Sequence, residues 1–456
     1  MRRKYLPHDK VFNKKLLTLV LPITFQQFML AVVSASDAIM LGLVNQNSLS
    51  AVSLAGQVQF IFNLFLAALT IGASMFSAQY WGKRDKNAVE QILGIVLRIS
   101  VTVSVLFFLA ALCFPASVMR VFTPDIHLIK DGAVYLRTVS VSYLFCGISQ
   151  IYLCIMKNTG RASKSSLISS TAVILNIILN AILIFGLLGA PKMGIAGAAA
   201  ATAAARLLEL IWVWADSRGK SQIHVRAEYL LHPDARLKCA FWKYTLPVLG
   251  NELVWGCGFT MYSVIMGHLG TDAVAANSIA NIVKNLIACF CLGLGSGGGI
   301  IVGGELGAGR PDRAIEYGSR LCRLSIFAGI CSGLVLLAVS PLILSLSTLS
   351  SRAGTYLQIM LFICSYYIIG KSVNGATIAG IFCAGGDSKF GLICDIITLW
   401  CITVPLGLAA AFLWKLPVPA VYLIISMDEI IKLPAVYKHY KKFTWVKDLT
   451  TNNTAK

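Results

Sequence analysis

The sequence is poor in charged residues. Only 13% of its 456 residues are Asp, Glu, Lys or Arg, whereas soluble domains carry about 25%. Hydrophobic residues make up 57% of the chain, and the mean hydropathy is +0.75. This composition excludes an ordinary soluble protein and predicts an integral membrane protein.

Sequence motifs of common enzymes are also absent. The chain has no GxxxxGK[ST] loop, no HExxH and no GxSxG, so we expect neither an ATPase domain nor a hydrolase. Its 13 cysteines include no CxxC pair and no Cys/His cluster, which predicts reduced packing residues and no cofactor. GLGSGG at 293–298 satisfies GxGxxG but lies inside an apolar segment, so we expect helix packing there. The protein is therefore expected not to be an enzyme.

Long apolar segments predict twelve membrane-spanning helices. An α-helix needs about 20 apolar residues to cross a bilayer, and such segments recur along the whole chain. The expected spans are residues 16–44, 49–80, 91–114, 133–156, 167–188, 195–215, 241–268, 274–304, 318–346, 355–381, 390–414 and 418–437. The predicted fold class is an all-α polytopic membrane protein.

Positive charge is distributed in a way that predicts orientation. The formal net charge is +19, and Lys and Arg gather before the first span, in alternate connections and after the last span. Cytoplasmic loops carry such an excess, so both termini are predicted to be cytoplasmic. Membrane topology, together with contact with anionic lipid, accounts for the excess of positive charge. No nucleic-acid partner is therefore expected.

The two halves of the chain resemble each other. Pro22 and Pro247 lie 225 residues apart (247 − 22), as do Gly82 and Gly307 (307 − 82). Six spans in each half give both copies the same orientation, which predicts two pseudo-symmetric six-helix lobes with a cavity between them. The expected domains are residues 1–216, a cytoplasmic linker 217–240, and residues 241–456.

Asp37 is the only ionisable residue between 16 and 44. A carboxylate at membrane depth costs roughly 2.5–3.5 kcal/mol on insertion scales, so Asp37 is predicted to be a cation-coupling residue. The alternative is a solvated position near the headgroups. Asn176 and Asn180 lie four residues apart and share one helix face. They can bind Na⁺ or hold a carboxylate, and hydrogen bonding between helices explains them equally well.

Ionisable residues also lie within the spans of the second half. Glu252 is predicted to be buried and functional, with an interfacial position as the alternative. Lys371 is expected either to extend to the interface or to pair with an acid across the cavity. The remaining acids are Asp395, Asp428 and Glu429. The last two precede Lys432 by about one turn, so we expect ion pairing near the cytoplasmic end.

Together these features resemble the multidrug and toxic compound extrusion (MATE) family. The resemblance rests on ASDAIMLG, LNIILNAILIFG, MGIAGAAAAT, AGGDSK and DEIIKLP, which extend over essentially the whole chain. It implies a Na⁺- or H⁺-coupled antiporter that exports organic cations and amphipathic drugs across the plasma membrane, and we expect a monomer in lipid. The alternative is a lipid or polysaccharide-precursor flippase of the same superfamily, which would need a more cationic cavity.

The resemblance also implies residue roles in the N-terminal lobe. Asp37 matches the aspartate of a cation site in the first helix of that family. Asn176, Asn180 and Thr202 match positions around it, so any Na⁺ is expected at Asp37.

A second site is implied in the C-terminal lobe. Glu252 matches a glutamate found in one branch of the family. The aspartate that accompanies it in that branch falls near Ser372, in a segment that contains Lys371 and Asn374 but no acid. We therefore expect these four residues at a C-lobe cavity and rank the N-lobe site above it.

Overall fold

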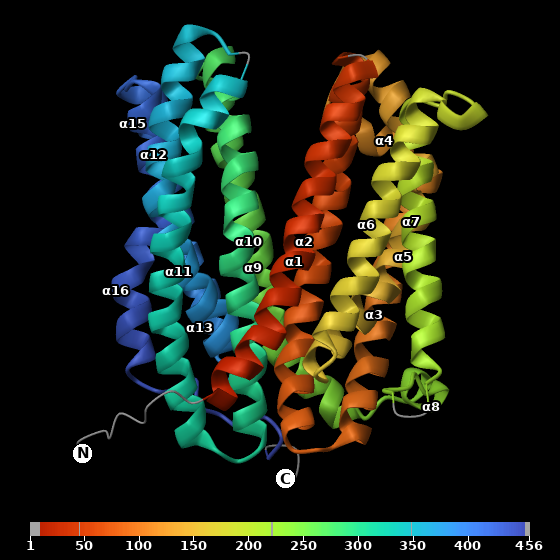
Figure 1. Ribbon diagram of the computed structural model, residues 1–456, viewed down its shortest axis with the longest axis vertical. Helices are drawn as coiled ribbons and strands as arrows, with labels where there is room; N and C mark the ends of the chain where they lie inside the picture. Colours follow the sequence, from red (N-terminus) through yellow and green to blue (C-terminus); the bar gives the residue numbers. More distant parts are fainter. Residues whose placement is uncertain (1–9, 45, 220–221, 348, 452–456) are drawn as a thin grey trace.

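The computed structural model describes residues 10–44, 46–219, 222–347 and 349–451. Every regular element within these residues is helical, and none of them forms a strand. The helices stand in two bundles side by side (Figure 1), which we call the N-lobe and the C-lobe. This arrangement confirms the predicted all-α class. The basic residues before Lys10, used above to orient the N-terminus, lie outside the described residues.

The N-lobe is formed by the first six predicted spans. Its long helices are α1 (Lys10–Val44), α2 (Gln46–Gly82), α3 (Lys86–Cys113), α5 (Ile126–Asn158), α6 (Ala162–Phe185) and α7 (Ile195–Ser217). A short helix α4 (Pro115–Arg120) and a 3-10 turn (Leu187–Gly189) lie in the connections.

The C-lobe is formed by the other six. They are α9 (Ala235–Gly267), α10 (Thr271–Gly307), α11 (Pro311–Leu346), α12 (Ser351–Asn374) with its π-helical continuation (Gly375–Phe382), an eleventh span and a twelfth span. The eleventh span is a series of α13 (Ser388–Asp395), a π-helical segment (Ile396–Thr403), α14 (Val404–Leu408) and a second π-helical segment (Ala409–Leu413).

The twelfth span differs from the prediction of one helix over 418–437. The structure has α15 (Val418–Ile425) and α16 (Asp428–Tyr440), separated at Ser426 and Met427. This break places the carboxylates of Asp428 and Glu429 in the first turn of α16. Negative charge is favourable there because the backbone N–H groups at a helix N-terminus are unpaired.

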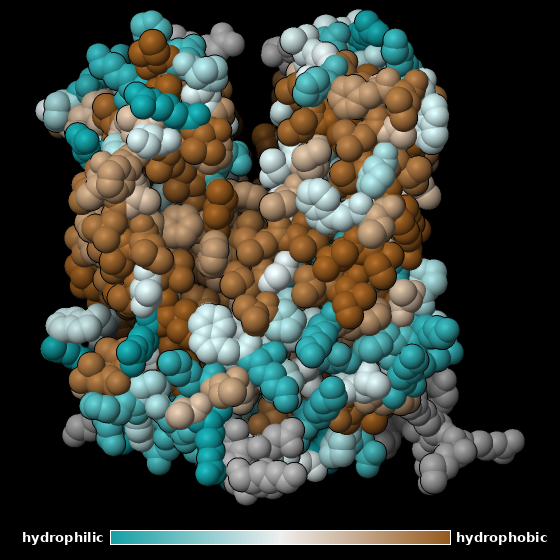
Figure 2. Space-filling model, turned by 180° about the vertical axis from the view of Figure 1, so that it is seen from behind, coloured by the Kyte–Doolittle hydropathy of each residue, from teal (hydrophilic) through white to brown (hydrophobic). Residues whose placement is uncertain are grey.

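Helix length and surface composition agree with a membrane protein. Ten of the described helices are long and apolar enough to cross a bilayer. The two remaining spans are α9, which carries Asn251 and Glu252, and the broken pair α15 and α16. Figure 2 shows an apolar band across the middle of the face in view, with polar residues toward both ends. Large side chains such as Phe327 and Phe362 are more than half exposed on this surface, as expected of residues that face lipid.

The lobes meet most closely at the end where α1 begins, which is the lower end in Figure 1. We call this the basal end. A Cβ atom on Gly82 of α2 would collide with the carbonyl of Gly304 on α10, and one on Gly307 would collide with the carbonyl of Gln79. These glycines therefore let the two backbones pack in direct contact.

The chain after α16 crosses the basal end. Trp445 is fully buried, and Leu449 packs in a cluster with Phe76 and Val89 of the N-lobe. The side chain of Gln79 is also fully buried. It donates to the carbonyls of Ala384 (2.7 Å) and Lys447 (3.1 Å), and its Oε1 accepts from the Leu449 N–H (2.7 Å). Residues 441–451, which we call the terminal strap, thus join both lobes.

The opposite end is open. Figure 2 shows a deep groove between the lobes that starts at this end. The molecule is therefore closed at the basal end and hollowed from the other.

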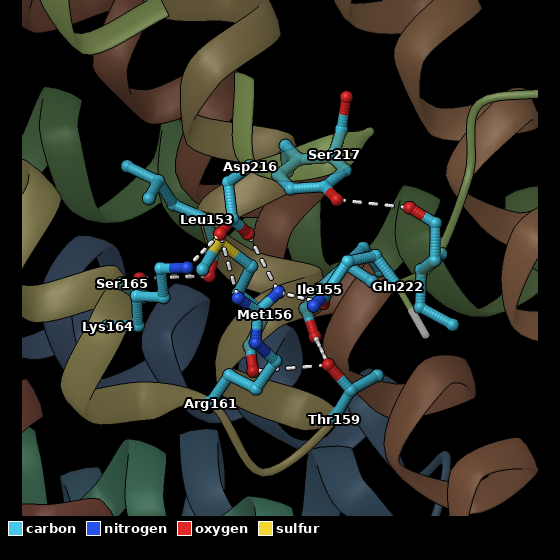
Figure 3. A network of polar contacts seen from close by, with 12 residues as sticks. Leu153, Ile155, Met156, Thr159, Arg161, Lys164, Ser165, Asp216, Ser217 and Gln222 are labelled. Atoms are coloured by element: carbon cyan, nitrogen blue, oxygen red, sulfur yellow. Dashed lines mark hydrogen bonds and ion pairs between the residues drawn. The ribbon is translucent and has the colours of Figure 1, made fainter. Parts of the chain in front are cut away.

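The linker between the lobes is held against the N-lobe. Asp216 accepts a hydrogen bond from Arg161 Nη2 (2.9 Å) and forms ion pairs with Arg161 Nη1 (2.8 Å) and with Lys164. Gln222 accepts a hydrogen bond from Arg161 Nη1 (Figure 3). A short helix α8 (Ala227–Leu231) follows. Helix α9 begins at Ala235, inside the predicted linker of residues 217–240. The lobe limits 1–216 and 241–456 stay a prediction.

Candidate functional site

A chain of hydrogen bonds in the N-lobe joins the four residues expected around a cation site. Asn180 donates to Asp37 Oδ1 (2.6 Å) and to Asn176 Oδ1 (3.2 Å), and Asn176 donates to Thr202 Oγ1 (3.3 Å). Asp37 comes from α1, the asparagines from α6 and Thr202 from α7. The structure therefore brings together residues that are up to 165 positions apart (202 − 37).

Local sequence explains how these side chains converge. Asn176 and Asn180 are one turn apart, so both project from the same face of α6. Thr202 donates to the Ala198 carbonyl (3.0 Å), which leaves its oxygen free to accept from Asn176. Gly197 faces the Leu183 carbonyl so closely that a Cβ there would lie 2.6 Å from the oxygen. The small residues of α7 thus let it pack tightly against α6.

Asp37, Asn176 and Thr202 lie at the wall of a cavity of about 440 Å³, which we call the N-lobe cavity. Its polar lining is dominated by amide side chains and includes two basic residues. The polar residues at the wall include Gln26, Gln27, Gln59, Asn63, Gln150, Asn176, Asp37, Tyr135, Ser142, Thr202, Lys157 and Arg206. Ser296 of α10 completes part of the wall, so the cavity opens toward the C-lobe.

The oxygen atoms around Asp37 suit a small hard cation or a proton. Asn180 Oδ1 is buried and accepts no hydrogen bond within the described part of the chain. Together with the Asp37 carboxylate it supplies the neutral and anionic oxygens that hard cations prefer. Among the described residues, no three His, Cys, Asp or Glu side chains are placed so that they could hold a metal ion together, as a typical zinc or iron site requires.

Arg206 and Glu209 lie beside this cavity. Neither was identified from the sequence as a candidate site residue. Both are on α7, and Arg206 Nη1 donates to Glu209 Oε2 at 2.7 Å. Glu209 is fully buried. The available signal was an acid and a base three residues apart in a span that otherwise begins almost entirely with Gly and Ala.

Glu252 lines a second cavity, of about 360 Å³, which lies between the lobes. Its wall includes Gln27 and Thr70 from the N-lobe and Gly295 and Gly380 from the C-lobe. Gly295 belongs to the GLGSGG segment, and a Cβ there would lie 2.9 Å from the Gly375 carbonyl. The segment therefore lies at a close helix contact, as expected. The Glu252 carboxylate has no hydrogen bond or ion pair with any described residue.

The other residues expected at the C-lobe cavity point in different directions. Lys371 Nζ lies 5.8 Å from the ring centroid of Trp255 and 5.9 Å from that of Tyr367. Ser372 is fully buried and donates to the Ser325 carbonyl on α11 (2.7 Å). Asn374 donates to the backbone carbonyl and the carboxylate of Glu429, each at 2.7 Å.

Two members of the expected four-residue C-lobe site thus form hydrogen bonds elsewhere, and the site stays a prediction. Ser372 and Asn374 are used in contacts with neighbouring helices, because residues one or two positions apart on a helix face different sides. Glu252 remains at the cavity between the lobes.

A buried charge cluster occupies the interior of the C-lobe. Lys432 lies 2.7 Å from Asp395, 3.7 Å from Asp428 and 3.8 Å from Glu429. The predicted pairing of Lys432 with Asp428 and Glu429 is thus present, but Asp395 of α13 is its nearest partner.

Lys284 is a further residue that was not identified from the sequence. It is the only Lys or Arg in α10, which was the available signal. Its side chain is buried and lies 4.9 Å from the Tyr367 ring centroid. It lines a small pocket of about 30 Å³ together with Trp255, Tyr262 and Asp428.

Known proteins provide an independent comparison. Residues 22–182 and 247–437 match the model of the MatE family, and the two matches begin 225 residues apart (247 − 22). A multidrug resistance protein, PmpM of Pseudomonas aeruginosa, is 25% identical over 86% of this chain and 83% of its own length. An uncharacterized transporter of Bacillus subtilis, YisQ, is 21% identical over 97% of this chain and 96% of its own.

Solved structures share the fold. A multidrug resistance MATE family transporter, described in an outward-facing conformation, has a TM-score of 0.87 at 17% identity and covers 98% of this chain and 100% of its own. A transporter from Pyrococcus furiosus, described as having a binding pocket of reverse polarity, has a TM-score of 0.86 at 17% identity over 98% of this chain and 100% of its own. The likeness extends over both lobes and supports the twelve-span, two-lobe layout.

Proposed function

Because the chain belongs to the MatE family of transporters, we propose that it is a cation-coupled antiporter that exports organic cations and amphipathic drugs across the plasma membrane. The observation that carries this proposal is the Asp37 carboxylate. It is bound by Asn180 at 2.6 Å and lines a cavity of about 440 Å³. An acid in such a cavity can attract a positively charged substrate and can also be neutralised by a smaller cation.

Competition for Asp37 provides a coupling mechanism. An organic cation and the coupling ion, Na⁺ or H⁺, both neutralise the same carboxylate, so binding of one weakens binding of the other. If the lobes prefer different arrangements with each ligand, entry of the ion on one side releases substrate there. Antiport requires only this exclusion together with alternating access of the cavity.

The hydrogen-bond chain connects ligand binding at Asp37 to the positions of α6 and α7. Asn180 donates to both Asp37 and Asn176, and Asn176 in turn donates to Thr202. A cation bound at Asp37 Oδ1 would displace or reorient the Asn180 amide, and the change would pass from α1 to α6 and α7. These residues are the proposed cation-coupling group.

The basal end is proposed to be cytoplasmic. Basic residues gather in the connections and the strap at this end, including Lys83, Arg84, Arg161, Lys164, Arg310, Arg313, Lys441 and Lys442. Cytoplasmic loops carry such an excess. The open groove then faces outward, and we propose that the transporter works as a monomer, with one cavity per chain.

The flippase alternative is not favoured. The matched family model is MatE, and several relatives are described as multidrug resistance proteins. Members of this family are transporters, in keeping with the absence of catalytic motifs from the sequence.

Transport in proteoliposomes tests the proposal. Purified protein is reconstituted, and efflux of a fluorescent organic cation is followed under an imposed Na⁺ gradient and, separately, a pH gradient. We expect efflux under one of them. Asp37→Asn keeps the shape and the hydrogen bond but removes the charge, and it should reduce ion-driven efflux to the level of empty liposomes. Efflux at the wild-type rate from Asp37→Asn would assign coupling to another residue, with Glu252 as the first candidate.

A further inference from the structure

We infer that Arg206 forms an anion-binding subsite in the N-lobe cavity, which selects substrates that carry a carboxylate in addition to a positive charge. The inference rests on the proposed function and specifies its substrate class. Arg206 and Glu209 take no part in the proposed coupling mechanism.

Glu209 is buried behind the cavity wall and orients the Arg206 guanidinium. Its Oε2 accepts from Arg206 Nη1 (2.7 Å), and its Oε1 accepts from Ser149 Oγ (2.7 Å) and Gln150 Nε2 (2.8 Å). The Glu209 side chain is fully buried. Both Glu209 carboxylate oxygens therefore accept hydrogen bonds from neighbouring side chains, and the Glu209 charge neutralises that of Arg206.

Arg206 itself remains accessible. Its side chain is 24% exposed and lines the N-lobe cavity. A guanidinium carries five N–H donors in a planar fork, and its hydrogen bond within the described part of the chain is the one to Glu209. The other donors are available to a ligand in the cavity. A guanidinium oriented by a buried carboxylate binds an incoming carboxylate well, because two parallel N–H···O bonds can form.

The position of Arg206 relative to Asp37 defines the ligand. Thr202, Arg206 and Glu209 lie on one face of α7, at spacings of four and three residues. Thr202 is the last member of the hydrogen-bond chain from Asp37, and Arg206 lies one turn, about 6 Å, nearer the basal end. The cavity thus offers a carboxylate and a guanidinium at different depths, which suits a zwitterionic amphipathic molecule.

Lys157 is the other basic residue at the wall of this cavity. It lies seven residues after Gln150 on α5, about 10 Å nearer the basal end. Because Gln150 contacts Glu209, Lys157 lies well below Arg206. It therefore serves as a control for the general effect of positive charge.

The experiment uses two probes that differ only in the anionic group, a rhodamine dye with a free carboxylate and the methyl ester of the same dye. Binding of each to the purified full-length protein in nanodiscs is measured by fluorescence polarisation. We expect the wild type to bind the acid about tenfold to a hundredfold more tightly than the ester, since the difference is a hydrogen bond between charged groups. Equal affinities in the wild type would overturn the inference without any variant.

Variants then locate the subsite. Arg206→Gln alone would leave Glu209 buried without its cation, so the main variant is Arg206→Gln combined with Glu209→Gln. We expect it to bind the ester as the wild type does and to lose the preference for the acid. Lys157→Gln should keep most of the preference. A preference that survives in the double variant, or that is lost in Lys157→Gln, would show that Arg206 is not the anion-binding residue.

The same dyes separate this inference from the proposed function. Efflux of the ester from proteoliposomes together with equal binding of acid and ester would refute the anion subsite and leave the antiporter proposal intact. Tighter binding of the acid without efflux of either dye under Na⁺ or pH gradients would refute the antiporter proposal and leave the subsite intact.

Discussion

Gln79 is predicted to control opening of the basal end. Its amide makes three hydrogen bonds to residues of the second half, with the Ala384 carbonyl (2.7 Å), the Lys447 carbonyl (3.1 Å) and the Leu449 N–H (2.7 Å). The lobes cannot separate at this end without breaking at least some of them. Gln79→Ala removes all three and leaves these backbone groups without the amide that now pairs with them.

The size of the effect follows from these contacts. One such hydrogen bond contributes about 0.5–1.5 kcal/mol net, so three contribute about 1.5–4.5 kcal/mol if they act independently. Because each 1.4 kcal/mol is a factor of ten, states with an open base or a detached strap should become about 10-fold to 1,000-fold more populated. Gln79→Glu keeps an acceptor for Leu449 but cannot donate to the two carbonyls, and should have a similar effect.

Hydrogen–deuterium exchange measures this change directly. The Leu449 amide is protected by its bond to Gln79, so exchange in the strap peptide 445–451 should accelerate in Gln79→Ala by about the factor given above. Gln91→Ala is the matched control, because Gln91 is a half-buried glutamine near the basal end of α3. Strap exchange that is unchanged in Gln79→Ala would show that these hydrogen bonds do not hold the base closed.

Two further predictions concern the C-lobe and the linker. Lys432→Gln leaves Asp395, Asp428 and Glu429 without their shared cation. We expect the free energy of unfolding to fall by about 3–5 kcal/mol, measured as a lower unfolding temperature in detergent. Asp395→Asn should lower it less, because Lys432 still pairs with the other two acids. Brief trypsin treatment of the purified protein should cleave first at the exposed Arg218, between α7 and α8, and yield two fragments of nearly equal size. Initial cleavage inside either lobe would contradict the predicted domain limits.

Features that depend on neighbouring residues were predictable from the sequence. Apolar runs long enough to cross a bilayer gave the helices, because their length is set by membrane thickness rather than by tertiary contacts. The spacing of Asn176 and Asn180 placed both on one face of a helix for the same local reason. The repeat of Pro22 at Pro247 indicated two lobes of the same orientation, and the family resemblance placed Asp37 and Thr202 near the asparagines.

Features that depend on contacts between distant segments were decided only by the tertiary structure. Gln79 is one of many polar residues near a helix end, and its burial exists because the terminal strap folds across both lobes. Arg206 and Glu209 could be read as a simple pair on one helix, but Ser149 and Gln150 of α5 fix the carboxylate and so orient the guanidinium. Likewise, Ser372 was expected at a cavity but donates to α11. The sequence by itself determined where most of the membrane-spanning helices lie and that Asn176 and Asn180 share one helix face, because hydropathy and spacing are local. Only the packing of those helices decided which charges meet, because the partners of a side chain depend on which other helix packs against its face.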